Sequence, residues 1–199
     1  MLGDAEERLD ALDDRRLIAR VAERDHAALR ALVDRHWVAM HRHARALSGD
    51  AAMAEDAVQE AFVSVWSHAA GFRGEHPSAR GWLFAIVRNA VRAQARGRAR
   101  STPEDSEDVS ALGERAGFGD PGRGHSLERA LESREAVEQG LAGLGEGDRE
   151  IVLLVDGEGF SVEEAAASLG VTLAAAKSRL HRARLRLVSI LSAREEDAS

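Results

Sequence analysis

The sequence contains no cysteine among its 199 residues. Disulfides, thiolate zinc sites and cysteine nucleophiles are therefore excluded, and a reducing compartment is compatible with the composition. Aromatic residues make up only 4% of the chain, so leucine, valine and alanine must fill most of any core, which favours helices. No apolar run approaches the roughly 18 residues that span a bilayer, and the acidic start lacks the apolar segment of a signal peptide. We therefore expect a cytoplasmic protein without membrane insertion.

Positive charge is in deficit overall but is concentrated in two stretches. The formal net charge is -7, which by itself argues against a nucleic-acid partner because phosphate contacts need local positive charge. Residues 88–100 nevertheless contain five arginines and no acid, and residues 173–194 contain six basic residues and no acid. A solvated cationic face explains such runs as readily as DNA binding does. Only the sequence pattern around each basic stretch can distinguish a solvated face from a DNA-binding surface.

Helical patterning occurs in two blocks that are separated by a stretch of different composition. Asp25 is placed to cap a helix that Gly49 ends. The stretch between the blocks is rich in glycine, serine, proline and acid, which is typical of a linker. As a coil its ends would lie roughly 25–30 Å apart. We predict an all-α fold of two small helical domains, residues 1–100 and 126–199, joined by a flexible acidic linker, residues 101–125.

The second block contains the outline of a helix-turn-helix. Ser161 and Glu164 have the spacing of a capping box, Gly170 supplies a turn residue, and Thr172 is placed to cap the next helix. That helix carries an apolar line that we expect to be buried, formed by Leu173, Ala176, Leu180, Leu187 and Leu191. Because a capped short helix and a turn aim the N-terminal end of the following helix into a major groove, this arrangement favours DNA binding over a solvated face.

Both blocks resemble one known family. The segment "EGFSVEEAAASLGVTLAAAKSRLHRARLRL" resembles region four of bacterial RNA polymerase sigma factors of the extracytoplasmic-function (ECF) group, and "AEDAVQEAFVSVW" with "WLFAIVRNAVRAQAR" resembles region two. The resemblance implies a subunit that binds core RNA polymerase and directs promoter-specific transcription initiation. It further implies a monomer when free, whose partners are core RNA polymerase, promoter DNA and an anti-sigma factor. The C-terminal domain would recognise the minus-thirty-five duplex, and the N-terminal domain would melt the minus-ten element.

The resemblance also implies site residues for each partner. The outer face of one helix would bind core polymerase through Asp56, Gln59, Glu60 and Val63. The minus-ten element would contact Phe72, Arg73, Arg80, Trp82, Arg88, Asn89 and Arg92. The minus-thirty-five element would contact Ser161, Thr172, Lys177, Ser178, Arg179, His181 and Arg182. A polar outer face without any partner is the commoner explanation for a single acidic helix, but an exposed valine argues against it and the resemblance favours docking.

Other functions find less support in the sequence. A homodimeric helix-turn-helix regulator that binds DNA without polymerase is the alternative, with residues 1–100 as its sensing or dimerisation domain. No nucleophile–base pair and no glycine-rich phosphate loop occur as a motif, so we expect no enzyme and no cofactor. His36 and His43 are spaced to share a helix face, but no carboxylate completes a ligand set, so we expect no metal site.

Overall fold

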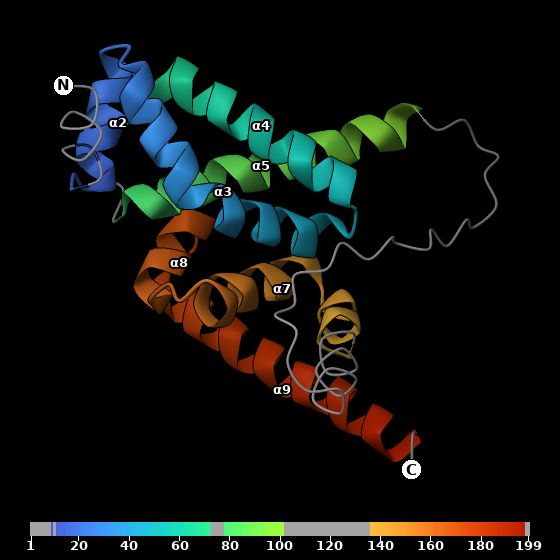
Figure 1. Cartoon of the computed structure of the whole chain (residues 1–199). Coiled ribbons are helices and arrows are strands. Elements are labelled where there is room, and N and C mark those ends of the chain that lie inside the picture. Colours follow the sequence, from blue (N-terminus) through green and yellow to red (C-terminus); the bar gives the residue numbers. More distant parts are fainter. Residues whose placement is uncertain (1–8, 10, 73–77, 102–135, 198–199) are drawn as a thin grey trace, which may run out of the picture.

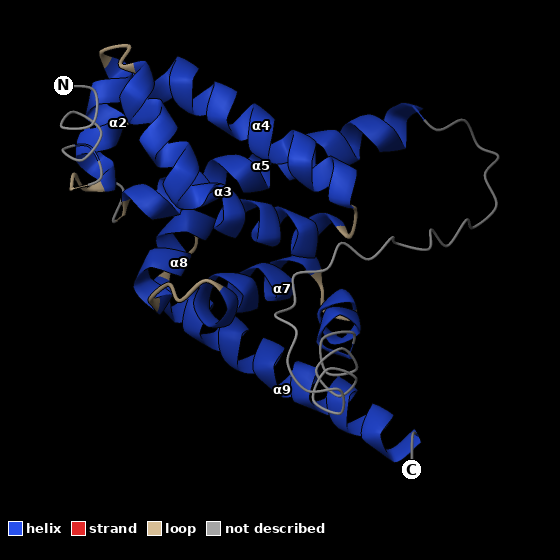
Figure 2. Ribbon diagram, viewed as in Figure 1, coloured by secondary structure: helices blue, strands red, loops and turns tan. Residues whose placement is uncertain are grey.

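Two helical units lie against each other in the computed structural model of the chain, which describes residues 9, 11–72, 78–101 and 136–197 (Figure 1). The N-terminal unit contains α2 (Asp14–Ala22), α3 (His26–Ser48), α4 (Ala51–His68), a short 3-10 helix (Ala69–Gly71) and α5 (Ala79–Ser101). The C-terminal unit contains a helical segment at 136–142, α7 (Glu146–Val152), a π-helical turn (Leu153–Gly157), α8 (Val162–Leu169) and α9 (Leu173–Asp197). Figure 2 shows that every regular element of the described ranges is helical, which confirms the predicted fold class.

Side-chain caps fix where the helices of the N-terminal unit begin. Asp25 accepts hydrogen bonds from the backbone N–H groups of Ala27 and Ala28, at 2.9 and 3.2 Å, and so caps α3. Gly49 ends α3 with a φ of 72°, a left-handed conformation that glycine adopts without a steric penalty. Asp50 then caps α4 by accepting from the N–H of Met53 at 3.0 Å. The predicted start and end of α3 are therefore confirmed.

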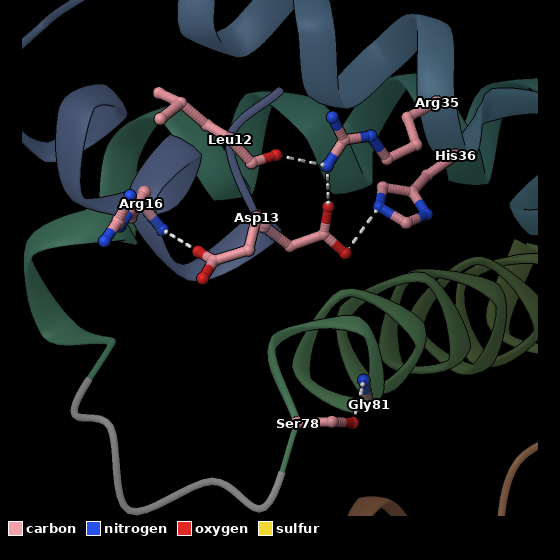
Figure 3. Close-up of polar contacts among 8 residues, drawn as sticks. Leu12, Asp13, Arg16, Arg35, His36, Ser78 and Gly81 are labelled. Atoms are coloured by element: carbon pink, nitrogen blue, oxygen red, sulfur yellow. Dashed lines mark hydrogen bonds and ion pairs between the residues drawn. The ribbon is translucent and has the colours of Figure 1, made fainter. Parts of the chain in front are cut away.

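Helix α2 is held on α3 by a partly buried polar cluster (Figure 3). The Nη1 atom of Arg35 lies 2.7 Å from Oδ1 of Asp14, and Nε2 of His36 lies 2.9 Å from its Oδ2. Arg35 also donates to the carbonyl of Leu12. Burial opposes ionisation of Asp14, but the hydrogen bonds of His36 and Arg35 outweigh it and hold the pKa of the carboxyl below its ordinary value. The cluster thus joins α2 to the packed layer of α3, α4 and α5.

The C-terminal unit contains the predicted helix-turn-helix. Ser161 and Glu164 form a reciprocal capping box at the start of α8, and Gly170 ends that helix with a φ of 67°. Thr172 then accepts a hydrogen bond from the N–H of Ala175 at 3.2 Å, in the first turn of α9. Ala165 and Ala176 are fully buried, which allows α8 and α9 to approach closely. The turn glycine and both caps were read correctly from the sequence.

The predicted linker lies almost entirely outside the described residues. Of the predicted linker, Ser101 ends α5 and the rest lies outside the described residues, so the domain boundaries stay predictions. Among the described helices, none is long and apolar enough to cross a membrane.

Candidate nucleic-acid and polymerase interfaces

The N-terminal half of α9 presents most of its predicted DNA-binding side chains to solvent. Lys177, Ser178, His181 and Arg182 are exposed, and Arg182 donates to Oγ of Ser178 at 3.0 Å. The opposite side of the helix is closed by Ala176, Leu180 and Ala183, which are buried against the rest of the C-terminal unit. Helix α9 therefore packs through small and aliphatic residues and leaves a polar, cationic face open.

The remaining residues predicted to contact the minus-thirty-five element lie in different surroundings. Thr172 is exposed and caps α9, and Ser161 is exposed and engaged in the capping box of α8. Arg179 is half-buried and turned toward α7, where its Nη1 lies 3.0 Å from the position that a Cβ on Gly147 would occupy. The lack of a side chain on Gly147 is what gives this guanidinium room.

One part of the predicted buried line of α9 was wrong. Leu173 is 37% exposed. Residues 172–175 are all exposed, because the first turn of α9 extends beyond the surface that the other helices cover. The buried line starts one turn later, at Ala176. Ala174 and Ala175 leave the exposed end of the helix without bulky side chains.

The outer face of α4 agrees with the predicted periodicity. Asp56, Gln59 and Glu60 are exposed, and Val63 is 65% exposed beside them. The inward face of the same helix is buried and consists of Met53, Ala54, Ala57, Val58, Ala61, Phe62 and Val65. An exposed valine beside polar side chains is apolar surface that no other described residue covers.

The residues predicted to contact the minus-ten element are brought together only in part. Phe72 and Trp82 pack on each other, with ring centroids 5.0 Å apart, so Trp82 has a structural neighbour rather than an open face. Asn89 is exposed on α5, and Arg73 lies outside the described residues. Each of the other three, Arg80, Arg88 and Arg92, contacts the C-terminal unit.

Two carboxylates at this contact were missed by the sequence reasoning. Glu150 and Glu158 are buried, with 3% and 8% of their surfaces exposed. Burial raises the pKa of Glu150, against the opposing effects of the Arg92 and Arg88 charges. A signal was available for Glu150, because it precedes the buried Ile151 and stands four residues before the buried Leu154, on the apolar face of its helix.

Burial also changes the ionisation of two basic groups beside this contact. Desolvation lowers the pKa of Arg88. It also lowers the pKa of His43 to about 3, with further contributions from the positive charges of Arg88 and Arg42. His43 is therefore neutral at pH 7. Within the described ranges, no three histidine or acidic side chains are grouped so that they would hold a metal ion.

Comparison with known proteins follows the same division into two units. Residues 32–101 match the family model described as Sigma-70 region 2, and residues 134–187 match Sigma-70, region 4. The ECF RNA polymerase sigma factor SigL of Mycobacterium tuberculosis is 31% identical over 82% of this chain and 89% of its own length. The chain belongs to the ECF sigma factors. The sigma factor CnrH of Cupriavidus metallidurans is 34% identical to this ECF sigma factor, over 92% of this chain and 96% of CnrH.

Solved structures of sigma factors resemble this ECF sigma factor as well. CnrH in complex with the cytosolic domain of CnrY matches with a TM-score of 0.66 and 32% identity, over 90% of this chain and 97% of that chain. RpoE of Bartonella quintana, in complex with the anti-sigma factor NepR, matches with a TM-score of 0.59 and 28% identity, over 81% of this chain and 96% of that chain. The region two match in particular disfavours the alternative of a homodimeric regulator.

Proposed function

We propose that this sigma factor binds core RNA polymerase and directs promoter-specific initiation with a division of labour between its two units. The observation that best supports this proposal is the helix-turn-helix, in which the capped α8 and a glycine turn lead into the exposed, cationic start of α9. The same chain also contains the helical layer that matches region two. A recognition helix needs an exposed, polar N-terminal half on a rigid support, and α9 has both.

The exposed side chains of α9 divide into two kinds of DNA contact. Lys177 and Arg182 supply positive charge to phosphates or donors to guanine, while Ser178 and His181 supply shorter polar groups for base edges. Ala174 and Ala175 offer apolar contact to a thymine methyl. Arg179 would have to leave Gly147 to reach a base, so we assign it to the edge of the interface.

The N-terminal unit would contact the minus-ten element and the polymerase through separate helices. Arg80, Arg88, Asn89 and Arg92 of α5 offer charge and hydrogen bonds to an unwound strand. The outer face of α4 offers three polar side chains next to an exposed valine. Such a face suits docking to a protein, because burial of Val63 removes apolar surface from water and the polar rim gives specificity.

The test is transcription in a reconstituted system. The purified chain, added to core polymerase, should co-elute with it and start transcripts from a subset of promoters, whereas core alone should not. A chain with Lys177→Ala and Arg182→Ala should still co-elute with core but should lose initiation at promoters that depend on the minus-thirty-five element. Failure of the unmodified chain to bind core would contradict the proposal.

The partners and the place of action follow from the same proposal. Two relatives are recorded in complexes, CnrH with CnrY and RpoE with the anti-sigma factor NepR. We propose that an anti-sigma factor also controls this chain, and that it acts in the cytoplasm as a non-catalytic subunit. Co-purification of a sigma-binding protein from the native host, displaced when core polymerase is added, would test the first part.

A further inference from the structure

Helix α9 begins with a turn that is exposed and uncharged. Leu173 keeps 37% of its surface exposed, although it stands three positions before the fully buried Ala176 and seven before the buried Leu180. That spacing places it on the same side of the helix as the buried line. Leu173 is exposed because the first turn extends beyond the surface that the other helices cover. A large apolar side chain is thereby presented to solvent at the start of the recognition helix.

Hydrogen bonds fix the backbone of this turn. Thr172 accepts from the N–H of Ala175 at 3.2 Å through its hydroxyl and from the N–H of Ala176 at 2.9 Å through its carbonyl. The N–H of Val171 donates to the carbonyl of Ala166 at 3.0 Å, which ties the turn to α8. A side chain on such a preorganised turn contacts a ligand without the cost of ordering a loop.

Positive charge follows directly after the apolar turn. Lys177 is exposed four positions after Leu173, on the same side of the helix. Arg182 is exposed further along α9, and residues 173–194 contain no acidic residue. The charge of this surface therefore complements an anionic polymer. The occupant that fits has to combine negative charge with an apolar group that Leu173 can contact.

Duplex DNA presents one such apolar group in its major groove, the 5-methyl group of thymine. Leu173, Ala174 and Ala175 have no hydrogen-bonding group in their side chains. They are therefore unable to recognise the donors and acceptors of the base edges. The alanine side chains end at Cβ, whereas the leucine extends to its Cδ atoms. Of these three residues, Leu173 reaches furthest from the backbone.

We propose that Leu173 determines specificity in the minus-thirty-five interface by packing against the 5-methyl group of one thymine. This inference rests on the proposed function, since it takes from it the placement of α9 in a major groove. Contacts to phosphates hold any sequence, because they carry no information about the bases. The contact of Leu173 adds affinity only where a thymine occurs, so it discriminates among promoters.

The test replaces single thymines by uracil, which differs from thymine only in lacking the 5-methyl group. Holoenzyme reconstituted from the purified chain and core polymerase first selects a preferred duplex from a library that is randomised in the minus-thirty-five element. Each thymine of the selected element, on either strand, is then replaced by uracil, and the affinity is measured by competition. At one position the unmodified chain should lose about fourfold in affinity, the equivalent of burying one methyl group.

The variant Leu173→Ala should remove this sensitivity to the methyl group. It should bind the thymine duplex about fourfold more weakly than the unmodified chain does, and it should bind the thymine and uracil duplexes equally. The change should not disturb the fold, because the position is exposed and alanine favours helix. A merely structural role of Leu173 would weaken binding to both duplexes and leave the ratio of their affinities unchanged.

Two further variants serve as controls. Leu185→Ala shortens a leucine that is 59% exposed on the same helix, about 18 Å further along its axis. It should keep both the affinity and the thymine-to-uracil ratio of the unmodified chain. Leu173→Met retains an apolar side chain of similar reach, so it should preserve most of the ratio that Leu173→Ala loses.

The outcomes separate this inference from the proposed function. An unchanged thymine-to-uracil ratio in Leu173→Ala overturns the inference, and so does a selected duplex in which no thymine responds to uracil. In both cases the holoenzyme still binds a specific promoter, so the proposed function stands. A holoenzyme that selects no sequence at all would overturn the proposed function, and the inference would fall with it.

Discussion

His43 provides a direct test of the electrostatic description of the N-terminal unit. Its ring is buried, stands edge-on to Phe84 at a centroid distance of 5.2 Å, and leaves Nδ1 without a hydrogen-bond partner. Burial, and then the charges of Arg88 and Arg42, lower its pKa from 6.5 to about 3. We predict that His43→Leu makes the chain more resistant to acid.

The sign follows from proton binding in the two states. Between pH 6.5 and about 3 the unfolded chain binds a proton at residue 43 and the folded chain does not. The free energy of unfolding therefore falls as the pH falls through this window, by about 1.4 kcal/mol per pH unit. From pH 7.5 to pH 5 the loss due to His43 is about 2 kcal/mol. Leucine does not titrate, so this loss disappears in the variant, while the near-equal volume keeps the cost at pH 7.5 below about 1.5 kcal/mol.

Tryptophan fluorescence during urea unfolding is the appropriate assay. The three tryptophans, at positions 37, 66 and 82, all lie in the N-terminal unit with His43. The difference between the unfolding free energies of variant and unmodified chain should shift by about 2 kcal/mol between pH 7.5 and pH 5. His41→Gln, at a half-exposed position of the same helix, should follow the unmodified chain. Parallel pH profiles for His43→Leu and the unmodified chain would refute the reasoning.

Three further predictions concern the other surfaces and the helix caps. Asp56→Ala or Gln59→Ala should weaken binding to core polymerase without changing the circular dichroism, whereas Ser67→Ala should bind normally; equal affinities would remove this face from the docking site. Arg182→Ala in the holoenzyme should weaken promoter binding. If Arg182 reads a base, the loss should be about 1–3 kcal/mol and depend on one promoter position, and if it contacts phosphate, the affinity should fall uniformly across promoters. Unchanged affinity at every promoter would contradict both roles. Asp25→Ala removes the α3 cap and should lower the urea midpoint by the equivalent of about 1 kcal/mol, and an unchanged midpoint would contradict that role.

Local features of the fold were predictable because each depends on a short stretch of sequence. Helix α3 begins after its cap Asp25 and ends at Gly49, and α8 and its turn are defined by Ser161, Glu164 and Gly170. A cap needs only the residues within one helical turn, so spacing is sufficient evidence for it. The outer face of α4 was predictable for the same reason, since helical periodicity alone separates its buried and exposed sides.

The surroundings of the arginines were not predictable in this way. Arg92 pairs with a residue 58 positions further along the chain, Glu150, and Arg42 pairs with Glu158, 116 positions away. Periodicity carries no information about contacts between separate units. The π-helical turn at 153–157 adds to the difficulty, because its i to i+5 hydrogen bonds interrupt the 3.6-residue period just before Glu158 and Phe160. The wider turn of a π-helix shifts the positions that face the core, so the α-helical spacing of apolar residues does not identify Glu158 as buried.

The choice of arginine connects the acidic composition with the two cationic surfaces. Of the 27 lysine and arginine residues, all but Lys177 are arginine, and the planar guanidinium binds carboxylates and phosphates with the same fork of donors. Among the described residues, Glu158 accepts two hydrogen bonds from Arg42, and Glu150 forms an ion pair with Arg92. The net charge of -7 then repels bulk DNA from the free chain. On the proposed function, the local positive charge of α5 and α9, and not the overall charge of the chain, governs contact with the phosphate backbone.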